Sequence, residues 1–224
     1  MKNGDLNKNE NKTSAIAIQL KVCGMNKNTA EVAALAPDYL GFIFWEPSSR
    51  CFQETMPTIN ESINKIGVFV DTTIDGIIEK VTKFDLWGVQ LHGNESEDYC
   101  RQLKKATPQL KIIKVFSIKD NFDFDILKAF ETLCDFYLFD TKGKLPGGNG
   151  YTFDWTVLKN YPSTKPYFLS GGIGIEEIDA IKEFMTRPEA KYCHVIDVNS
   201  KFEIEPGLKN IENLKEFKKV LSKK

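Results

Sequence analysis

The feature that most constrains this 224-residue chain is a pattern that occurs eight times, a short apolar run followed by a segment with apolar residues at helical spacing. Short apolar runs bounded by Gly, Pro or polar residues predict buried strands, and apolar residues three and four positions apart predict amphipathic helices. Alternation of the two predicts a parallel sheet covered by helices. Eight units are typical of a closed (β/α)8 barrel, the TIM barrel, whereas open doubly wound sheets usually have fewer strands. We therefore expect an α/β fold, a TIM (β/α)8 barrel in a single domain.

The predicted elements follow one another from residue 16 to residue 221. The expected strands share apolar runs that stop at a polar residue or Gly, and they cover 16–23, 38–45, 65–70, 86–92, 111–116, 136–140, 167–170 and 193–198. The expected helices share apolar residues on one face, and they cover 28–36, 59–64, 73–84, 96–106, 124–133, 155–159, 175–185 and 211–221. Residues 1–15 are polar and rich in Asn and Lys, without the apolar core of a signal peptide. We interpret 1–15 as a disordered N-terminal tail and 16–224 as the barrel domain.

The composition limits what the chain as a whole can attract. The formal net charge is −1, so no chain-wide field attracts nucleic acid or an anionic membrane, and a phosphate ligand needs a local site. Five cysteines without metal-type spacing, and two histidines, predict reduced thiols and no metal site. No apolar run approaches the length of a membrane span. We expect a cytoplasmic protein, monomer or homodimer, whose partner is a small molecule.

Candidate site residues are the polar side chains at the strand ends, because active sites of such barrels lie at the C-terminal ends of the strands. The loops after the seventh and eighth strands form the phosphate position of the fold. Four residues there are expected to offer backbone N–H groups to a phosphate: Gly171, Gly172, Asn199 and Ser200. A tight turn is the alternative interpretation of the two glycines.

Cys23 and Asp140 are the candidates for acid–base chemistry. Cys23 ends the first strand, and Lys21 lies two residues earlier on the same face, where an ammonium favours the thiolate and lowers the pKa of Cys23. A thiolate can act as a general base, and a buried apolar cysteine is the alternative. Asp140 ends the sixth strand beside a glycine-rich loop that includes Gly148, which suggests an acid next to an anion site. An ordinary surface loop is the alternative.

Three further polar residues are candidates for ligand binding. Arg50 lies in the loop after the second strand and could hold a carboxylate in a bidentate geometry, although a solvated surface charge is the alternative. His92 ends the fourth strand and could bind a ligand, transfer a proton or serve as an orienting histidine. Asp197 ends the eighth strand and could bind a ligand or hold the following loop.

A series of short motifs over residues 19–220 matches one family in order and spacing. They are KVCGM at 21–25, GFIF at 41–44 with Ser49-Arg50, GVFV at 67–70, VQLHG at 89–93, Asp140 with GGNG at 147–150 and FDW at 153–155, LSGGI at 169–173, and DVNS at 197–200 with Glu203 and PGLK at 206–209. In this series the chain resembles the phosphoribosylanthranilate isomerases, barrel enzymes of tryptophan biosynthesis.

The resemblance implies an Amadori rearrangement of N-(5-phosphoribosyl)anthranilate, with no cofactor because proton transfers alone complete it. It places the general acid on Asp140, which opens the sugar ring, and the general base on Cys23, which removes the proton from C2. It places Arg50 at the anthranilate carboxylate. The implied phosphate region consists of Gly148, Gly171, Gly172, Asn199 and Ser200. His92 and Asp197 match polar site residues with less defined roles.

The chain departs from the family at Lys201 and Phe202, where Gly and an aliphatic residue are usual, and at Asn149, where Thr is commoner. One alternative is another phosphosugar isomerase or synthase barrel. Indoleglycerol-phosphate synthase would need Lys and Glu in place of Cys23 and Asp140, and the aminoaldose isomerase of histidine synthesis would need Asp at position 23. The other alternative is a non-catalytic phosphoribosyl-binding barrel, which would not need both Cys23 and Asp140.

Overall fold

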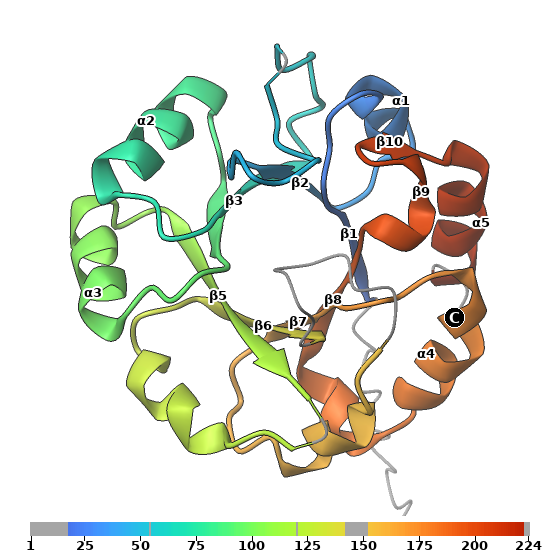
Figure 1. The fold of residues 1–224 in the computed structure, drawn as a ribbon. Coiled ribbons are helices and arrows are strands. Elements are labelled where there is room, and N and C mark those ends of the chain that lie inside the picture. The colour runs from blue at the N-terminus through green and yellow to red at the C-terminus, as the bar shows by residue number, and fades with distance from the viewer. Residues whose placement is uncertain (1–17, 54, 120, 142–151, 222–224) are drawn as a thin grey trace, which may run out of the picture.

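The computed structural model describes residues 18–53, 55–119, 121–141 and 152–221. In these residues eight parallel strands form a closed barrel in chain order, with helices around the outside (Figure 1). The strands are β1 (Gln19–Val22), β2 (Tyr39–Ile43), β3 (Asn64–Phe69), β4 (Gly88–Leu91), β5 (Lys111–Ile118), β6 (Phe136–Thr141), β7 (Tyr167–Leu169) and β8 (Cys193–Val198). The predicted (β/α)8 barrel is confirmed. The predicted tail at 1–15 and Gly148 lie outside the described residues, so the boundary at residue 16 stays a prediction.

The barrel closes where β1 pairs with β8, with Lys21 opposite Asp197 in the register. Side chains two apart on a strand share a face. The barrel interior holds an apolar cluster that includes Leu138 of β6 and Val195 of β8. Two residues further along the same strands, on the same face, are Asp140 and Asp197. The C-terminal ends of the strands therefore place polar groups directly above the apolar filling of the barrel.

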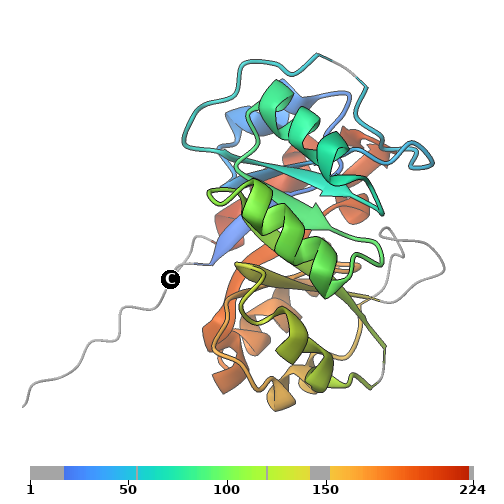
Figure 2. The same ribbon diagram turned by 90° about the vertical axis from the view of Figure 1, so that its left-hand side faces the viewer.

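Helices and short 3₁₀ turns cover the strands, and Figure 2 shows α2 and α3 packed on the outside of the barrel. The helical elements are α1 (Thr29–Ala34), α2 (Ile74–Phe84), α3 (Glu97–Ala106), η1 (Phe124–Phe130), η2 (Trp155–Asn160), η3 (Ile175–Glu177), α4 (Ile178–Phe184), η4 (Pro188–Tyr192), η5 (Ser200–Phe202) and α5 (Ile211–Leu221). Helices α2 and α3 begin where they do because the Thr73 and Ser96 side chains accept hydrogen bonds from the first-turn amides. After β8 a two-stranded pair, β9 (Glu203–Glu205) and β10 (Leu208–Lys209), leads into α5.

Four helix predictions differ from the structure, and the first of these is the predicted helix at 155–159, which is the 3₁₀ helix η2. The predicted helix at 59–64 is wrong: the Asn60 side chain accepts the Ser62 amide at 2.9 Å and forms a turn, and Asn64 already belongs to β3. The predicted helix at 124–133 is the shorter 3₁₀ helix η1, which begins where Asp123 accepts the Asp125 amide. The predicted helix at 175–185 is divided into η3 and α4. No helix in the described ranges is long and apolar enough to cross a membrane.

Candidate active site

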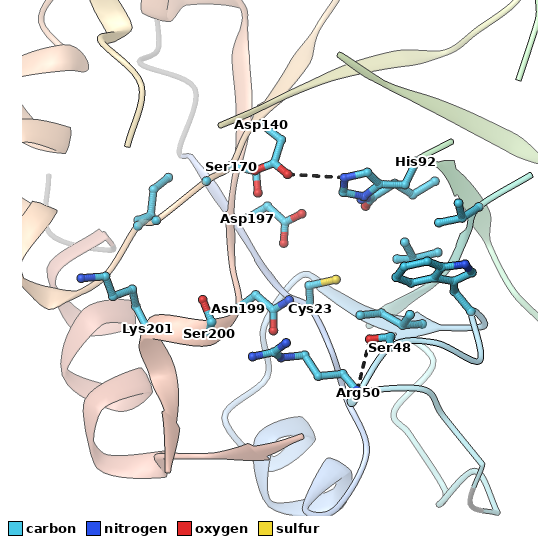
Figure 3. A pocket seen from close by; sticks show the side chains of 18 residues that line it. Cys23, Ser48, Arg50, His92, Asp140, Ser170, Asp197, Asn199, Ser200 and Lys201 are labelled. Carbon is cyan, nitrogen blue, oxygen red and sulfur yellow. Dashed lines mark hydrogen bonds and ion pairs between the residues drawn. The ribbon is translucent and has the colours of Figure 1, made fainter. Parts of the chain in front are cut away.

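A pocket opens at the C-terminal ends of the strands, and the strand-end candidates gather around it (Figure 3). Its lining residues are Cys23, Ile43, Trp45, Ser48, Arg50, Val68, Val70, Gln90, His92, Asp140, Ser170, Gly171, Gly172, Ile173, Asp197, Asn199, Ser200 and Lys201. The structure therefore brings together every predicted site residue except two. Lys21 does not line the pocket, because its side chain is fully buried beneath it. Gly148 lies outside the described residues.

Asp140 lies at the end of β6, with its carboxyl group buried and directed to the pocket (Figure 3). One oxygen, Oδ1, accepts the amide of Thr141 at 2.9 Å. The other, Oδ2, lies 3.4 Å from Nε2 of His92. His92 is held in place because its backbone amide donates a hydrogen bond to the carbonyl oxygen of Phe69 in β3 at 2.9 Å, as in the ladder between β3 and β4. Asp140 therefore faces the pocket from a fixed strand end, with one oxygen beside an imidazole.

Cys23 lies one residue past β1, where its amide donates to Val198 of β8 at 2.8 Å. Its thiol is buried, and Figure 3 shows it below Asp197 on the side of the pocket away from Asp140. Burial raises the pKa of this thiol, although the positive charges of Lys21 and Lys209 act to lower it. The expected lowering of the pKa is therefore wrong, because desolvation of the thiolate outweighs the nearby ammonium groups.

Lys21 lies at the centre of a buried polar network under the pocket. Its ammonium is 2.6 Å from Oδ2 of Asp197 and 2.6 Å from Oε1 of Gln90. Burial acts to lower the pKa of Lys21, but the attraction of Asp197 and of Cys23 outweighs it, and the pKa is raised. The ion pair leaves Oδ1 of Asp197 buried without a hydrogen bond from any described residue. This oxygen belongs to a pocket-lining side chain and can accept a ligand hydroxyl.

Arg50 is held by a second buried group, Glu203. Nε of Arg50 donates to both carboxylate oxygens at 3.0 and 2.8 Å, and one terminal nitrogen lies 2.7 Å from Oε2. The ammonium of Lys209, also buried, contacts Glu203 at 2.8 Å and the Asn199 side-chain oxygen at 2.8 Å. Burial acts to raise the pKa of Glu203, but Arg50 and Lys209 outweigh it, and the pKa is lowered. Arg50 is thus a fixed guanidinium at the pocket wall, not a solvated surface charge.

The loops after β7 and β8 lie on one side of the pocket (Figure 3). Gly171 has φ +95°, and an added Cβ there would lie 2.5 Å from the Thr141 amide nitrogen and 2.8 Å from its Cβ. Only glycine allows this close approach of the β7 loop to the end of β6. Asn199, Ser200 and Lys201 form the facing loop, and Lys201 lies 4.0 Å from Glu176. The two loops together present backbone groups and the ammonium group of Lys201 to one corner of the pocket.

Sequence reasoning missed Gln90, Glu203 and Lys209 as site residues. Gln90 is two residues before His92, and side chains two apart on a strand share a face. This spacing could have identified Gln90 as a site residue. Glu203 is 153 residues from Arg50 in sequence, and no local pattern connects the two. Lys209 belongs to β10, outside the eight barrel strands.

Comparisons with known proteins agree with one another. The family model described as N-(5'phosphoribosyl)anthranilate (PRA) isomerase matches residues 20–220. N-(5'-phosphoribosyl)anthranilate isomerase of Parabacteroides distasonis is 44% identical over 206 residues, which cover 88% of this chain and 90% of that protein. The enzyme of the same name from Phocaeicola vulgatus is 37% identical over 193 residues, covering 85% of this chain and 91% of that protein.

Solved structures show the same fold. The crystal structure of phosphoribosyl anthranilate isomerase from Thermus thermophilus has a TM-score of 0.75 at 21% identity, covering 91% of this chain and 98% of that one. Another isomerase, in complex with reduced 1-(o-carboxyphenylamino)-1-deoxyribulose 5-phosphate, has a TM-score of 0.71 at 23% identity, with the same coverage. With the family model and the close relatives, these findings show that the chain belongs to the N-(5'-phosphoribosyl)anthranilate isomerase family, whose members are isomerases of tryptophan biosynthesis.

Proposed function

We propose that this isomerase converts N-(5-phosphoribosyl)anthranilate to 1-(2-carboxyphenylamino)-1-deoxyribulose 5-phosphate, with Asp140 as general acid and Cys23 as general base. The observation that carries the proposal is that both groups line one pocket from different strands, on either side of the space that a sugar would occupy (Figure 3). Two groups that act on neighbouring sugar atoms need this placement. The alternative of a non-catalytic phosphoribosyl-binding barrel gives no reason for it.

The proposed reaction has three steps. Asp140 gives its proton to the furanose ring oxygen, the C1–O bond breaks, and the nitrogen lone pair forms an iminium ion. The Cys23 thiolate then removes the C2 proton, and the C–H electrons neutralise the iminium to give an enolamine. Tautomerisation moves the enol proton to C1 and gives the ketone. Asp140 ends as carboxylate and Cys23 as thiol, and exchange of protons with solvent restores both. The cationic imine acidifies the C–H bond, so the thiolate is a sufficient base.

The remaining pocket residues support a placement of the substrate. Arg50 lies at the wall opposite Asp140, where a guanidinium fixed by Glu203 can bind the anthranilate carboxylate. Gly171, Gly172, Asn199 and Ser200 lie at the phosphate corner. Gly148, which lies outside the described residues, is proposed for the same corner from the sequence alone. His92 and the unpaired oxygen of Asp197 face the sugar hydroxyls between these two ends, and Lys21 acts from below by holding Asp197.

The test is turnover followed by loss of the anthranilate fluorescence of the substrate. Cys23→Ala and Asp140→Asn are each expected to lower kcat by about 10²–10⁴-fold, the usual contribution of a general acid or base, while product binding persists. Cys193→Ala is the matched control, because Cys193 is equally buried but lies outside the pocket lining. Near-full turnover of either site variant would refute the assignment, and product binding without turnover by the unmodified protein would favour the non-catalytic alternative.

The monomer or homodimer state and the cytoplasmic location stay predictions.

A further inference from the structure

A continuous line of side chains connects the barrel floor to the acid of the proposed reaction. The Lys21 ammonium donates to Gln90 Oε1 at 2.6 Å, and Gln90 Nε2 lies 3.1 Å from His92 Nδ1. On the far side of the ring, His92 Nε2 lies 3.4 Å from Asp140 Oδ2. Gln90 is 2% exposed and Lys21 is fully buried, so water does not compete for the contact between these two side chains. The whole line is built on β1, β4 and β6.

The chemistry of Lys21 determines which way the Gln90 amide must face. An ammonium group can only donate, so the Gln90 atom beside it must be the carbonyl oxygen. Asp197, also 2.6 Å from the ammonium, keeps Lys21 charged. The amide –NH2 is then the only part of Gln90 left for the histidine. Rotating the amide by 180° would put two donors together at Lys21 and leave the buried carbonyl without its partner.

The orientation of Gln90 in turn determines the proton position on His92. Because the –NH2 group donates, Nδ1 of His92 must accept, and the ring proton is on Nε2. An imidazolium would need a proton on Nδ1 and would place two donors face to face. Nε2 is buried and makes no hydrogen bond to any described residue, although it lies within ion-pair distance of Asp140. Nε2 therefore carries its N–H on the side of the ring that faces Asp140, without a hydrogen bond to that carboxyl group in the free protein.

We propose that Gln90 is a positioning residue that keeps His92 neutral with its proton on Nε2, so that His92 serves as a hydrogen-bond donor beside Asp140 and not as an acid or base. A donor placed there stabilises the Asp140 carboxylate that forms when the ring oxygen takes its proton. A histidine able to exchange its own proton would compete for the same step. The effect on catalysis rests on the proposed role of Asp140, whereas the proton position on His92 does not.

Other charged groups on the neighbouring elements do not replace Gln90 at Nδ1. Lys114 of β5 is paired with Glu95 at 2.7 Å, and Glu95 also accepts the Asp71 amide at 3.0 Å. The Asp71 side chain accepts the Asn94 amide at 2.7 Å. Across the barrel, Asp197 is paired with Lys21, and Asp140 faces the opposite nitrogen of the ring. Gln90 is the described residue that contacts Nδ1 by hydrogen bonding.

Nitrogen-15 NMR of the histidine rings tests the proposal directly in the full-length protein. The sequence has two histidines, so two ring systems appear, and His194, stacked on Phe136 away from the pocket, is an internal reference. We expect Nδ1 of His92 to show the shift of an unprotonated nitrogen and Nε2 that of a protonated one. A protonated Nδ1 or an imidazolium in the unmodified protein at neutral pH would overturn the proposal.

Gln90→Glu reverses the polarity at Nδ1 with almost no change of shape. A carboxylate there accepts a hydrogen bond from a protonated Nδ1, so His92 is expected to become an imidazolium at neutral pH. The positive charge beside Asp140 then favours the Asp140 carboxylate over the protonated acid that the reaction needs, so kcat is expected to fall about tenfold, with little change in KM. Gln90→Met removes the donor without adding charge, and both neutral tautomers should then appear. If His92 keeps its Nε2–H signal alone in both variants, Gln90 does not set it and the proposal fails. Absence of turnover together with the expected spectra would refute the proposed function but not the role of Gln90.

Discussion

Replacing Lys21 by Met would test how strongly the buried ion pair under the pocket supports the fold. Met keeps most of the length and the apolar stem of the side chain but has no ammonium. Asp197, buried and 2.6 Å from that ammonium, would then be left as an unpaired charge. Removing one partner of a buried pair costs about 3–5 kcal/mol, which is large beside the total of about 5–15 kcal/mol for a typical domain.

The loss is measurable by thermal unfolding followed by circular dichroism. For a chain of this size about 1 kcal/mol corresponds to roughly 2–4 °C in Tm, so Lys21→Met is expected to lower Tm by about 6–20 °C. Lys65→Met is the matched control, because Lys65 is paired at 3.1 Å with Asp85, whose side chain is 97% exposed. Exposed pairs contribute about 0–1 kcal/mol, so the control should lose at most about 4 °C.

The double variant Lys21→Met with Asp197→Leu separates the two explanations of such a loss. If the unpaired carboxylate is the cause, removing it as well should restore part of the Tm, because no buried charge remains. Gln90 would still lack its partner, so full recovery is not expected. A double variant as unstable as Lys21→Met, or a Lys65→Met variant that loses as much, would refute the reasoning from burial.

Three further predictions concern activity. Because burial raises the pKa of the Cys23 thiol and only the thiolate removes a proton, kcat/KM should rise with pH above neutral, and a pH–rate profile without this limb would contradict the assignment. Gly171→Ala should lower both kcat and Tm, because its Cβ would lie 2.5 Å from the Thr141 amide next to Asp140; unchanged turnover and melting curves would show that the loop can move aside. Glu203→Gln should raise KM by about tenfold or more through loss of charge-assisted bonds to Arg50, and steady-state kinetics with an unchanged KM would show that Arg50 is positioned without it.

The barrel was predictable because buried parallel strands leave continuous apolar runs, which stand out even in short segments such as Tyr167–Leu169. The gathering of Cys23, His92 and Asp140 followed from topology, since the strand ends of a closed barrel face one opening. Neither inference needed any knowledge of side-chain contacts.

What the sequence could not reveal depends on contacts between distant residues. The pKa of Cys23 depends on how completely the neighbouring strands exclude water. The prediction from Lys21, two residues away in sequence, was a lowered pKa, whereas burial raises it. The partners Glu203 of Arg50 and Gln90 of Lys21 are 153 and 69 positions away. The false helix at 59–64 arose because Ile59 and Ile63 are four apart, although Asn60 makes a turn between them.

The salt bridge between Lys21 and Asp197 spans the seam of the ring, joining positions 176 residues apart. A shifted register between β1 and β8 would leave both charges buried without a partner. The pair therefore favours the observed register of β1 against β8, and because Cys23 and Asn199 lie just beyond the paired positions, the same register brings these two pocket residues together.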